Sequence, residues 1–176
     1  FQFSSGAAAN AGYEIERVRF DKLLPLAQGF QCAAEYMRAA GRPLTAFCAC
    51  ELRSPAAFSE AGFRAFNEHY VKTLAEWGIF IDGVNPVARS NVCPEIDPPA
   101  EPSFYAFSFT RPKADAGPTF VTAGGAESRS GDTPYADRII RYRDLSAEGL
   151  REKVAFVVGE MTDRLHAFGA TWKDTT

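Results

Sequence analysis

The sequence predicts a protein that combines helices and strands (α/β in the broad sense, of the α+β class), in which a mixed sheet packs on helices. Apolar residues recur at helical spacing in three segments, and residues 103–110 alternate as an aromatic-rich strand. Hydrophobic residues make up 46% of the 176-residue chain and charged residues 23%, which is enough apolar material for a packed core.

The composition restricts the partners. The formal net charge is −3, so the chain lacks the basic excess typical of broad nucleic-acid binding. No apolar run approaches the ~20 residues of a membrane helix, and the opening residues lack the basic and apolar regions of a signal peptide. We therefore expect a cytoplasmic protein with no membrane or nucleic-acid partner, and a flexible leader over residues 1–12.

The first expected elements are a strand over residues 13–20 and an amphipathic helix over residues 22–40. The strand follows from alternation of side chains, and the helix from the spacing of its apolar residues. Asp21 is expected to cap the helix at its N-terminus, and Gly41 to end it.

A buried strand and a second helix are expected next. Residues 44–52 form a short apolar run bounded by turn signals. Ser54-Pro55 resembles an N-cap followed by proline at the first helical position, and Gly78 ends the helix.

Two further strands should follow, over residues 87–93 and 103–110, with a proline-rich connector between them. Strict alternation in the second would place Phe104, Ala106 and Ser108 on one face and Tyr105, Phe107 and Phe109 on the other.

The remaining chain predicts a strand over 119–123, another over 138–142, and a third helix that Ser146 caps and Gly169 ends. The most favourable internal boundary is the polar, Pro- and Gly-containing stretch 111–118.

The ends of the first and third helices are similar. Residues 35–41 and 163–169 share an acid, an apolar residue, Arg or His, Ala and a final Gly in step. This similarity predicts two related units, 13–112 and a partial second one, 113–176, completed by another subunit or by further chain. The alternative is that two amphipathic helices resemble each other by chance.

The four cysteines predict neither a metal site nor disulfides. They contain no C-x-x-C pair, and the histidines His69 and His166 lie far from them in sequence. Small buried hydrophobic residues are the simpler interpretation of Cys48 and Cys50.

Two motifs carry a resemblance to a known family. Residues 85–92, Asn-Pro-Val-Ala-Arg-Ser-Asn-Val, resemble the Pro-Ala-Arg-Ser-x-Val signature of the RidA/YjgF family, and residues 120–125 resemble its Val-Ser-Gly strand. The resemblance implies a RidA-like (chorismate-mutase-like) fold, a homotrimeric barrel with clefts between subunits, and cofactor-free hydrolysis of enamines or imines to ketones and ammonia. It also implies that Arg89 holds a substrate carboxylate, which a planar guanidinium binds in a bidentate manner.

The resemblance extends to supporting residues. It places Tyr105 at or near the position of the family glutamate, as the group that would orient water. Ser90 and Asn91 would supply hydrogen bonds, and backbone amides near Val92 or Gly124 would stabilise developing charge. Because a tyrosine falls at or near the position of the family glutamate, the chain is similar to the divergent deaminases of 2-aminomuconate and its chlorinated relatives.

Alternatives remain at each level. Arg89 could be a structural arginine, Tyr105 a core aromatic residue, and Ser90 and Asn91 partners of backbone groups. A non-catalytic oligomer that binds small carboxylates would show the same features. Nuclease activity is the least favoured function, because the chain is acidic and lacks a catalytic histidine pair.

Overall fold

The computed structural model describes residues 4–131 and 133–176, which form two compact units. The first unit extends to Ala123 and the second comprises Gly124–Thr176. In chain order the elements are β1 (Gly6–Ala8), β2 (Tyr13–Pro25), α1 (Leu26–Ala39), the 3₁₀ turn Leu44–Ala46, β3 (Phe47–Arg53), α2 (Glu60–Glu76), β4 (Ala88–Val92), β5 (Ser103–Pro112), β6 (Phe120–Thr122), α3 (Tyr135–Arg138), α4 (Ala147–Ala167) and the 3₁₀ turn Trp172–Asp174.

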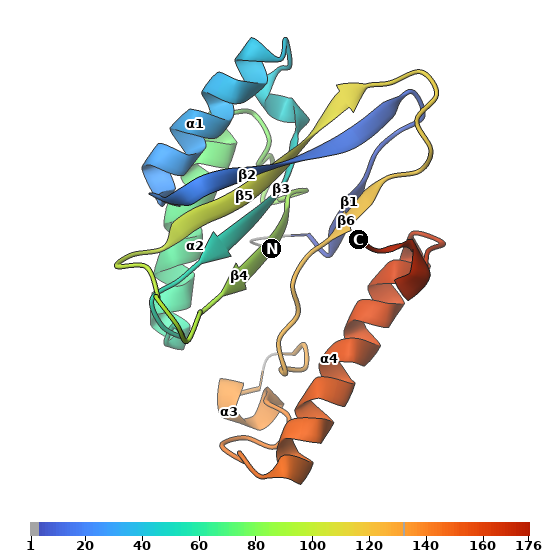
Figure 1. Cartoon of the computed structure of the whole chain (residues 1–176). Helices are drawn as coiled ribbons and strands as arrows, with labels where there is room; N and C mark the ends of the chain where they lie inside the picture. Colours follow the sequence, from blue (N-terminus) through green and yellow to red (C-terminus); the bar gives the residue numbers. More distant parts are fainter. Residues whose placement is uncertain (1–3, 132) are drawn as a thin grey trace. The chain divides into compact units, whose positions relative to one another are not determined.

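The first unit confirms the predicted mixed sheet packed on helices (Figure 1). Its four strands lie in the order β2-β5-β3-β4, in which β5 is antiparallel to both neighbours and β3 and β4 are parallel. A parallel pair needs a crossover connection, and α2 provides it between β3 and β4. Helices α1 and α2 pack on the same face, which we call the helix face; the opposite one is the open face.

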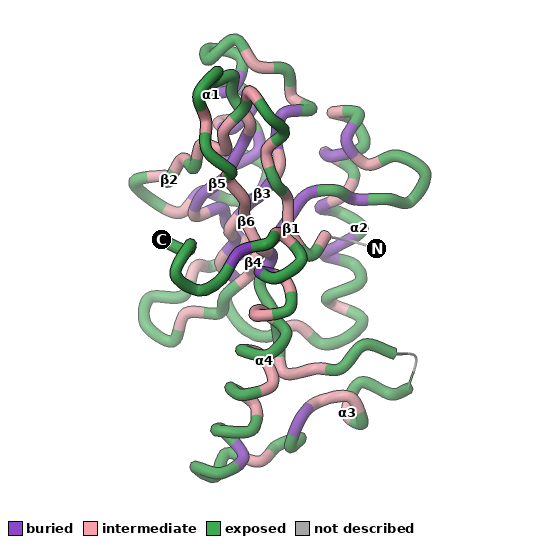
Figure 2. Tube along the Cα trace, turned by 90° about the vertical axis from the view of Figure 1, so that its right-hand side faces the viewer, coloured by how far each residue is buried: buried purple, intermediate pink, exposed green. Residues whose placement is uncertain are grey.

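The core of the first unit is aromatic. Phe30 of α1 contacts Tyr70 of α2 and Phe104 of β5, with ring centroids 5.8 and 4.9 Å apart, and Phe47 stacks on Phe107. Buried positions gather along the strands of this unit, whereas α4 buries only two residues (Figure 2). The helix face of the sheet is therefore a closed layer.

Close approach of α1 to the sheet depends on Gly29. A Cβ atom at this position would lie 2.3 Å from Cδ2 of Phe104, far inside van der Waals contact. Glycine, although unfavourable in a helix, is required here by packing.

The start of α1 differs from the sequence prediction. β2 continues to Pro25, so Asp21 lies within a strand and is not an N-cap. The pairing of β2 with β5 resumes at Leu24, opposite Phe104, after an irregularity that follows Arg19. Tertiary pairing thus overrides the local capping signal.

The start of α2 also differs. Ser59 rather than Ser54 is its N-cap, since the Ser59 hydroxyl accepts from the amide of Gly62. Ser54 is fully buried, and its hydroxyl donates to Oδ1 of Asn91 at 3.0 Å. The serine therefore ties the end of β3 to β4.

A bulge changes the predicted faces of β5. Glu51 of β3 pairs with Ala106 and Leu52 pairs with Phe104, so Tyr105 is the extra residue on β5. Phe104 consequently joins Phe107 in the core on the helix face, which corrects the strict alternation expected from sequence.

Residues 6–8 form β1, which pairs antiparallel with β6, whereas the sequence predicts a flexible leader over 1–12. Residues 1–3 of that predicted leader lie outside the described residues. Val121 and Ala123 pack on Ala49 and Ala88, so the β1–β6 pair covers one part of the open face.

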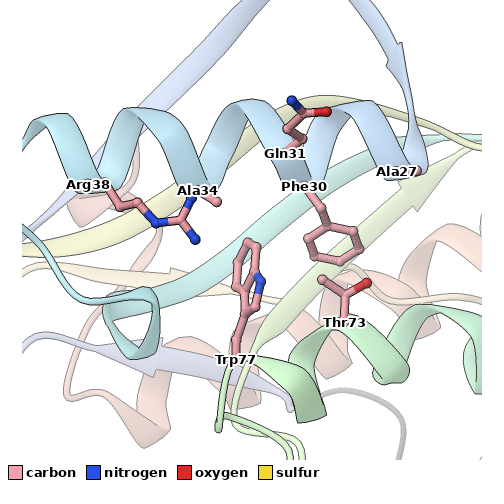
Figure 3. A pocket seen from close by; sticks show the side chains of 7 residues that line it. All are labelled: Ala27, Phe30, Gln31, Ala34, Arg38, Thr73 and Trp77. Atoms are coloured by element: carbon pink, nitrogen blue, oxygen red, sulfur yellow. The ribbon is translucent and has the colours of Figure 1, made fainter.

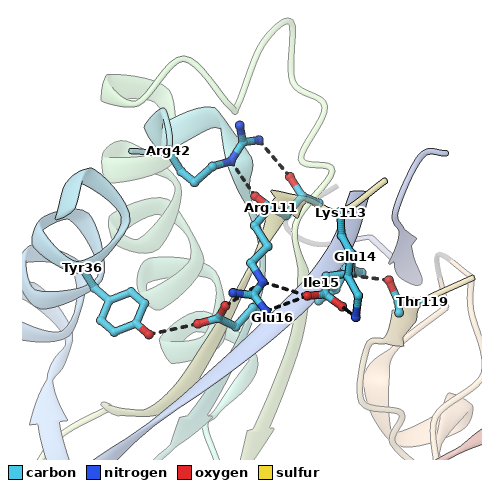
Figure 4. Close-up of polar contacts among 9 residues, drawn as sticks. Glu14, Ile15, Glu16, Tyr36, Arg42, Arg111, Lys113 and Thr119 are labelled. Carbon is cyan, nitrogen blue, oxygen red and sulfur yellow. Dashed lines mark hydrogen bonds and ion pairs between the residues drawn. The ribbon is translucent and has the colours of Figure 1, made fainter. Parts of the chain in front are cut away.

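Charged side chains tie β2 to β5 at the end distant from the bulge (Figure 4). Glu14 accepts from Arg111 and from Lys113, whose Nζ lies 2.6 Å from Oε2. Glu16 bridges Arg111 and the hydroxyl of Tyr36 on α1. Lys113 and then Arg111 hold the pKa of Glu14 below its usual value, so this carboxylate is charged at neutral pH.

The second unit contains α3 and α4. Ser146 caps α4 by accepting from the amide of Gly149, and Gly169 follows the helix with a φ of 68°, as predicted. Residues 138–142, expected as a strand, instead contain the last residue of α3 and an isolated bridge between Ser128 and Ile139. No helix in the described ranges is long and apolar enough to cross a membrane.

Candidate functional site

Arg89, the central residue of the sequence motif, lies on the helix face of β4. It pairs in register with Cys50 of β3 and is 5% exposed. Its Nη2 donates to Oδ1 of Asn67 on α2 at 2.7 Å. The guanidinium carbon also lies 4.7 Å from the ring centroid of Tyr70 and 5.2 Å from that of Phe66. Arg89 is thus enclosed between β4 and α2 by one amide and aromatic rings.

Burial dominates the electrostatics around Arg89. It lowers the pKa of Arg89 and raises that of Tyr70 well above the usual value. Burial also raises the pKa of Cys50 to about 11, although the Tyr70 hydroxyl, 3.4 Å from its sulfur, opposes that shift. At neutral pH the thiol and phenol are therefore neutral neighbours of the cation.

Two polar residues that flank Arg89 in the motif, Asn85 and Asn91, accept hydrogen bonds from neighbouring groups. Oδ1 of Asn85 accepts from the amide of Val87 at 2.9 Å, and Oδ1 of Asn91 accepts from Ser54. Both amide side chains thus stabilise the turn and strand around Arg89 through hydrogen bonds.

Tyr105 lies on the open face, among arginines from two neighbouring strands. The guanidinium of Arg53 is 4.2 Å from the ring centroid of Tyr105, and that of Arg17 is 5.8 Å from it. Arg19 hydrogen-bonds the Tyr105 hydroxyl. A carboxylate of the same face, Glu51, accepts from Nε and Nη2 of Arg17, the latter at 3.0 Å. We call Arg17, Arg19, Arg53, Glu51 and Tyr105 the arginine–tyrosine cluster.

Charge around Tyr105 favours its ionised form. The hydrogen bond from Arg19, together with the charges of Arg19, Arg17 and Arg53, lowers the pKa of Tyr105. Glu51 raises the pKa of Arg17 through their hydrogen bonds. The cluster is therefore a region of positive potential on a chain whose net charge is −3.

The sheet beneath the cluster carries small side chains. Ala49, Ala106 and Ser108 occupy the open face between the arginines, and Ser90 and Val92 continue it on β4 beside Glu51 and Arg53. Small residues leave room above the sheet for long side chains to converge.

The structure brings Ser90, Val92 and Tyr105 to one face of the sheet, but places Arg89 and Asn91 on the other. Within one chain the sheet therefore separates Arg89 from Tyr105, and a joint role of the two residues stays a prediction. Gly124 belongs to the second unit, where its carbonyl accepts from Nη1 of Arg164 at 2.9 Å.

Three arginines that surround Tyr105 were not among the residues predicted from the sequence. Arg17 and Arg19 alternate on β2, and Arg53 ends β3. The alternation was visible in the sequence, but the neighbouring strand order that unites β2, β5 and β3 was not.

A shallow hollow of about 310 Å³ lies between α1 and α2 (Figure 3). Its walls are mainly apolar, and Arg38 and Thr73 contribute polar groups. Among residues 4–131 and 133–176, no three His, Cys, Asp or Glu side chains are grouped so as to hold a metal ion.

A mixed sheet with helices on one face and converging arginines on the other defines an α+β protein with a cluster of positive charge on its open face. The model of the family described as "2-aminomuconate deaminase CnbZ" matches residues 1–176, and the chain belongs to this family. It is also 54% identical to a 2-amino-5-chloromuconate deaminase of Comamonas testosteroni over 176 residues, which cover 99% of the chain and 70% of that relative. No solved structure matches the chain.

Proposed function

We propose that this protein is a hydrolytic deaminase of 2-aminomuconate-type enamine or imine acids. The observation that carries the proposal is the 54% identity to a 2-amino-5-chloromuconate deaminase across nearly the whole chain, together with the family match over residues 1–176. The arginine-rich open face supports it, because such substrates carry two carboxylates.

The chemistry needs water and proton transfers. The enamine tautomerises to an imine, a water oxygen bonds to the imine carbon, and the carbon–nitrogen bond of the resulting carbinolamine breaks. Ammonia leaves with the protons that water and tautomerism supply, and a 2-oxo acid remains. This balance requires no redox partner, and we propose that no cofactor takes part.

The RidA/YjgF resemblance supports three further parts of the proposal. The helix–Gly–strand order and the motif around Arg89 are similar to that family, whose members form trimers. We propose that the protein is a homotrimer in the cytoplasm and that residues 13–112 and 113–176 are a RidA-like unit and a partial second one.

The role expected for Arg89 stays a prediction. A substrate carboxylate that reached it would have to displace Phe63, which lies 5.7 Å from the guanidinium and is the most exposed ring around it. The roles of Tyr105, Ser90, Asn91, Val92 and Gly124 as catalytic or binding groups are likewise proposed, with Tyr105 orienting water from the open face.

The test is ammonia release from 2-aminomuconate generated in situ, compared with the smaller 2-aminoacrylate. We expect the wild-type protein to accelerate release from 2-aminomuconate more than from 2-aminoacrylate. Absence of acceleration with both, in protein shown to be folded, would reject the enzyme and favour the alternative, a non-catalytic protein that binds small carboxylates.

A further inference from the structure

We infer that the arginine–tyrosine cluster on the open face binds a planar dicarboxylate, the substrate class of the proposed deaminase. The inference rests on the proposed function for the identity of the ligand, but on geometry for the site. It assigns binding to Arg17, Arg19 and Arg53 around Tyr105 and leaves Arg89 outside the site.

Like charges converge in the cluster. Three arginines from two strands meet around one ring, and Glu51 is the carboxylate that the described residues place among them. Like charges gathered at one place repel one another, so an arrangement of this kind is stabilised when an anion occupies it.

The guanidinium group of Arg53 is preorganised. Arg53 stacks on the Tyr105 ring and donates to the carbonyl of Leu52 at 2.9 Å, so its orientation is set before any ligand arrives. A guanidinium fixed in this way loses little conformational entropy when it binds a carboxylate.

Arg17 and Glu51 already show how the cluster holds a carboxylate. Their two hydrogen bonds form the bidentate pair that a guanidinium makes with any carboxylate. A ligand carboxylate would have the same geometry, so Glu51 competes with the ligand for Arg17.

The partly exposed ring of Tyr105 suits a flat, conjugated ligand. A diene can lie against the phenol ring while its carboxylates reach the surrounding guanidinium groups. Ala106 and Ser108 of β5, on the same face of the sheet, carry small side chains that do not compete with the ligand for the guanidinium groups.

The experiment measures binding without turnover. The probes are trans,trans-muconate and sorbate, which share a six-carbon diene and differ in having two carboxylates and one. Titration calorimetry should show tighter binding of muconate than of sorbate, and R53M and R19M should each weaken muconate binding about tenfold or more. R38M, which removes an exposed arginine from α1 on the helix face, is the matched control and should leave binding unchanged.

A gain-of-binding variant excludes misfolding as the explanation. E51Q keeps the shape of Glu51 but weakens its hold on Arg17, so it should tighten muconate binding severalfold. R53K keeps the charge and loses the planar group, so its muconate affinity should lie between those of wild type and R53M.

The outcomes separate this inference from the proposed function. Ammonia release by a protein whose muconate binding is unaffected by R53M, R19M and E51Q would overturn the inference and leave the deaminase. Arginine-dependent muconate binding without ammonia release from 2-aminomuconate would uphold the site and reject the activity.

Discussion

Nη2 of Arg89 donates a 2.7 Å hydrogen bond to Oδ1 of Asn67, and both side chains are buried between β4 and α2. The bond joins the strand that carries the sequence motif to the crossover helix above it. The contribution of Arg89 to stability can therefore be measured separately from any contribution to substrate binding.

R89M should lower the free energy of unfolding by about 1–3 kcal/mol, because it leaves a buried amide oxygen of Asn67 without this donor. The double variant R89M/N67L should be more stable than R89M, since both polar partners are then replaced by apolar groups. Urea unfolding of the two single variants and the double variant gives the coupling energy.

The same double variant tests the catalytic expectation. If Arg89 only joins α2 to β4, R89M/N67L should keep near-normal KM for 2-aminomuconate. A KM raised about tenfold or more in this stable variant would instead identify Arg89 as a carboxylate contact.

G29A should destabilise the first unit by about 1–3 kcal/mol, because the new methyl group would overlap the ring of Phe104. G159A is the matched control: Gly159 also lies within a helix, but nothing lies within 4 Å of its missing Cβ atom. This variant should stabilise α4 by about 0.5–1 kcal/mol. Thermal unfolding followed by circular dichroism measures both changes, and equal effects would contradict the packing argument.

Binding of muconate should weaken as pH rises towards the ordinary phenol pKa of about 10. The hydrogen bond from Arg19 and the surrounding arginines lower the pKa of Tyr105, so its phenolate forms earlier and repels a carboxylate. The other charged groups that face Tyr105 are Arg17, Arg53 and Glu51. In Y105F, the decline of muconate affinity between pH 8 and 10, measured by calorimetry, should disappear. If affinity still declines with pH in this variant, a group other than Tyr105 is responsible.

Stability should fall between about pH 9 and pH 11, because burial raises the pKa of Cys50 from 9.0 to about 11. The folded state keeps the thiol protonated in this window, whereas the unfolded chain releases the proton, so rising pH favours unfolding. C50A should reduce the slope of unfolding free energy against pH, whereas C93A, at an exposed position, should not. Identical slopes in C50A and wild type would count against the shift.

Local patterns were sufficient for several elements. Ser146 and Gly169 mark the ends of α4 correctly because N-caps and left-handed C-terminal glycines act within one turn of a helix. The apolar run that forms β3 and the aromatic run that forms β5 were also recognisable, because their many apolar and aromatic residues predict buried strands.

The errors occur where distant segments decide the conformation. Asp21 had the chemistry of a cap, but pairing with β5 kept it within β2. The bulge at Tyr105 depends on its two neighbouring strands, so no pattern within 103–110 could reveal it. The motif around Arg89 was found, but its enclosure by Asn67 and Tyr70 depends on how α2 packs on the sheet.

The pairing of β1 with β6 has a consequence for synthesis on the ribosome. Residues 6–8 are made early, but their partner strand Phe120–Thr122 emerges only after the four strands of the main sheet have been translated. The early segment must wait with its hydrogen-bonding groups unpaired, and non-local pairings of this kind form slowly. Closure of the β1–β6 pair is therefore expected to be a late event in maturation, and the hydrophobic patch of Ala49 and Ala88 would remain accessible to chaperones until then.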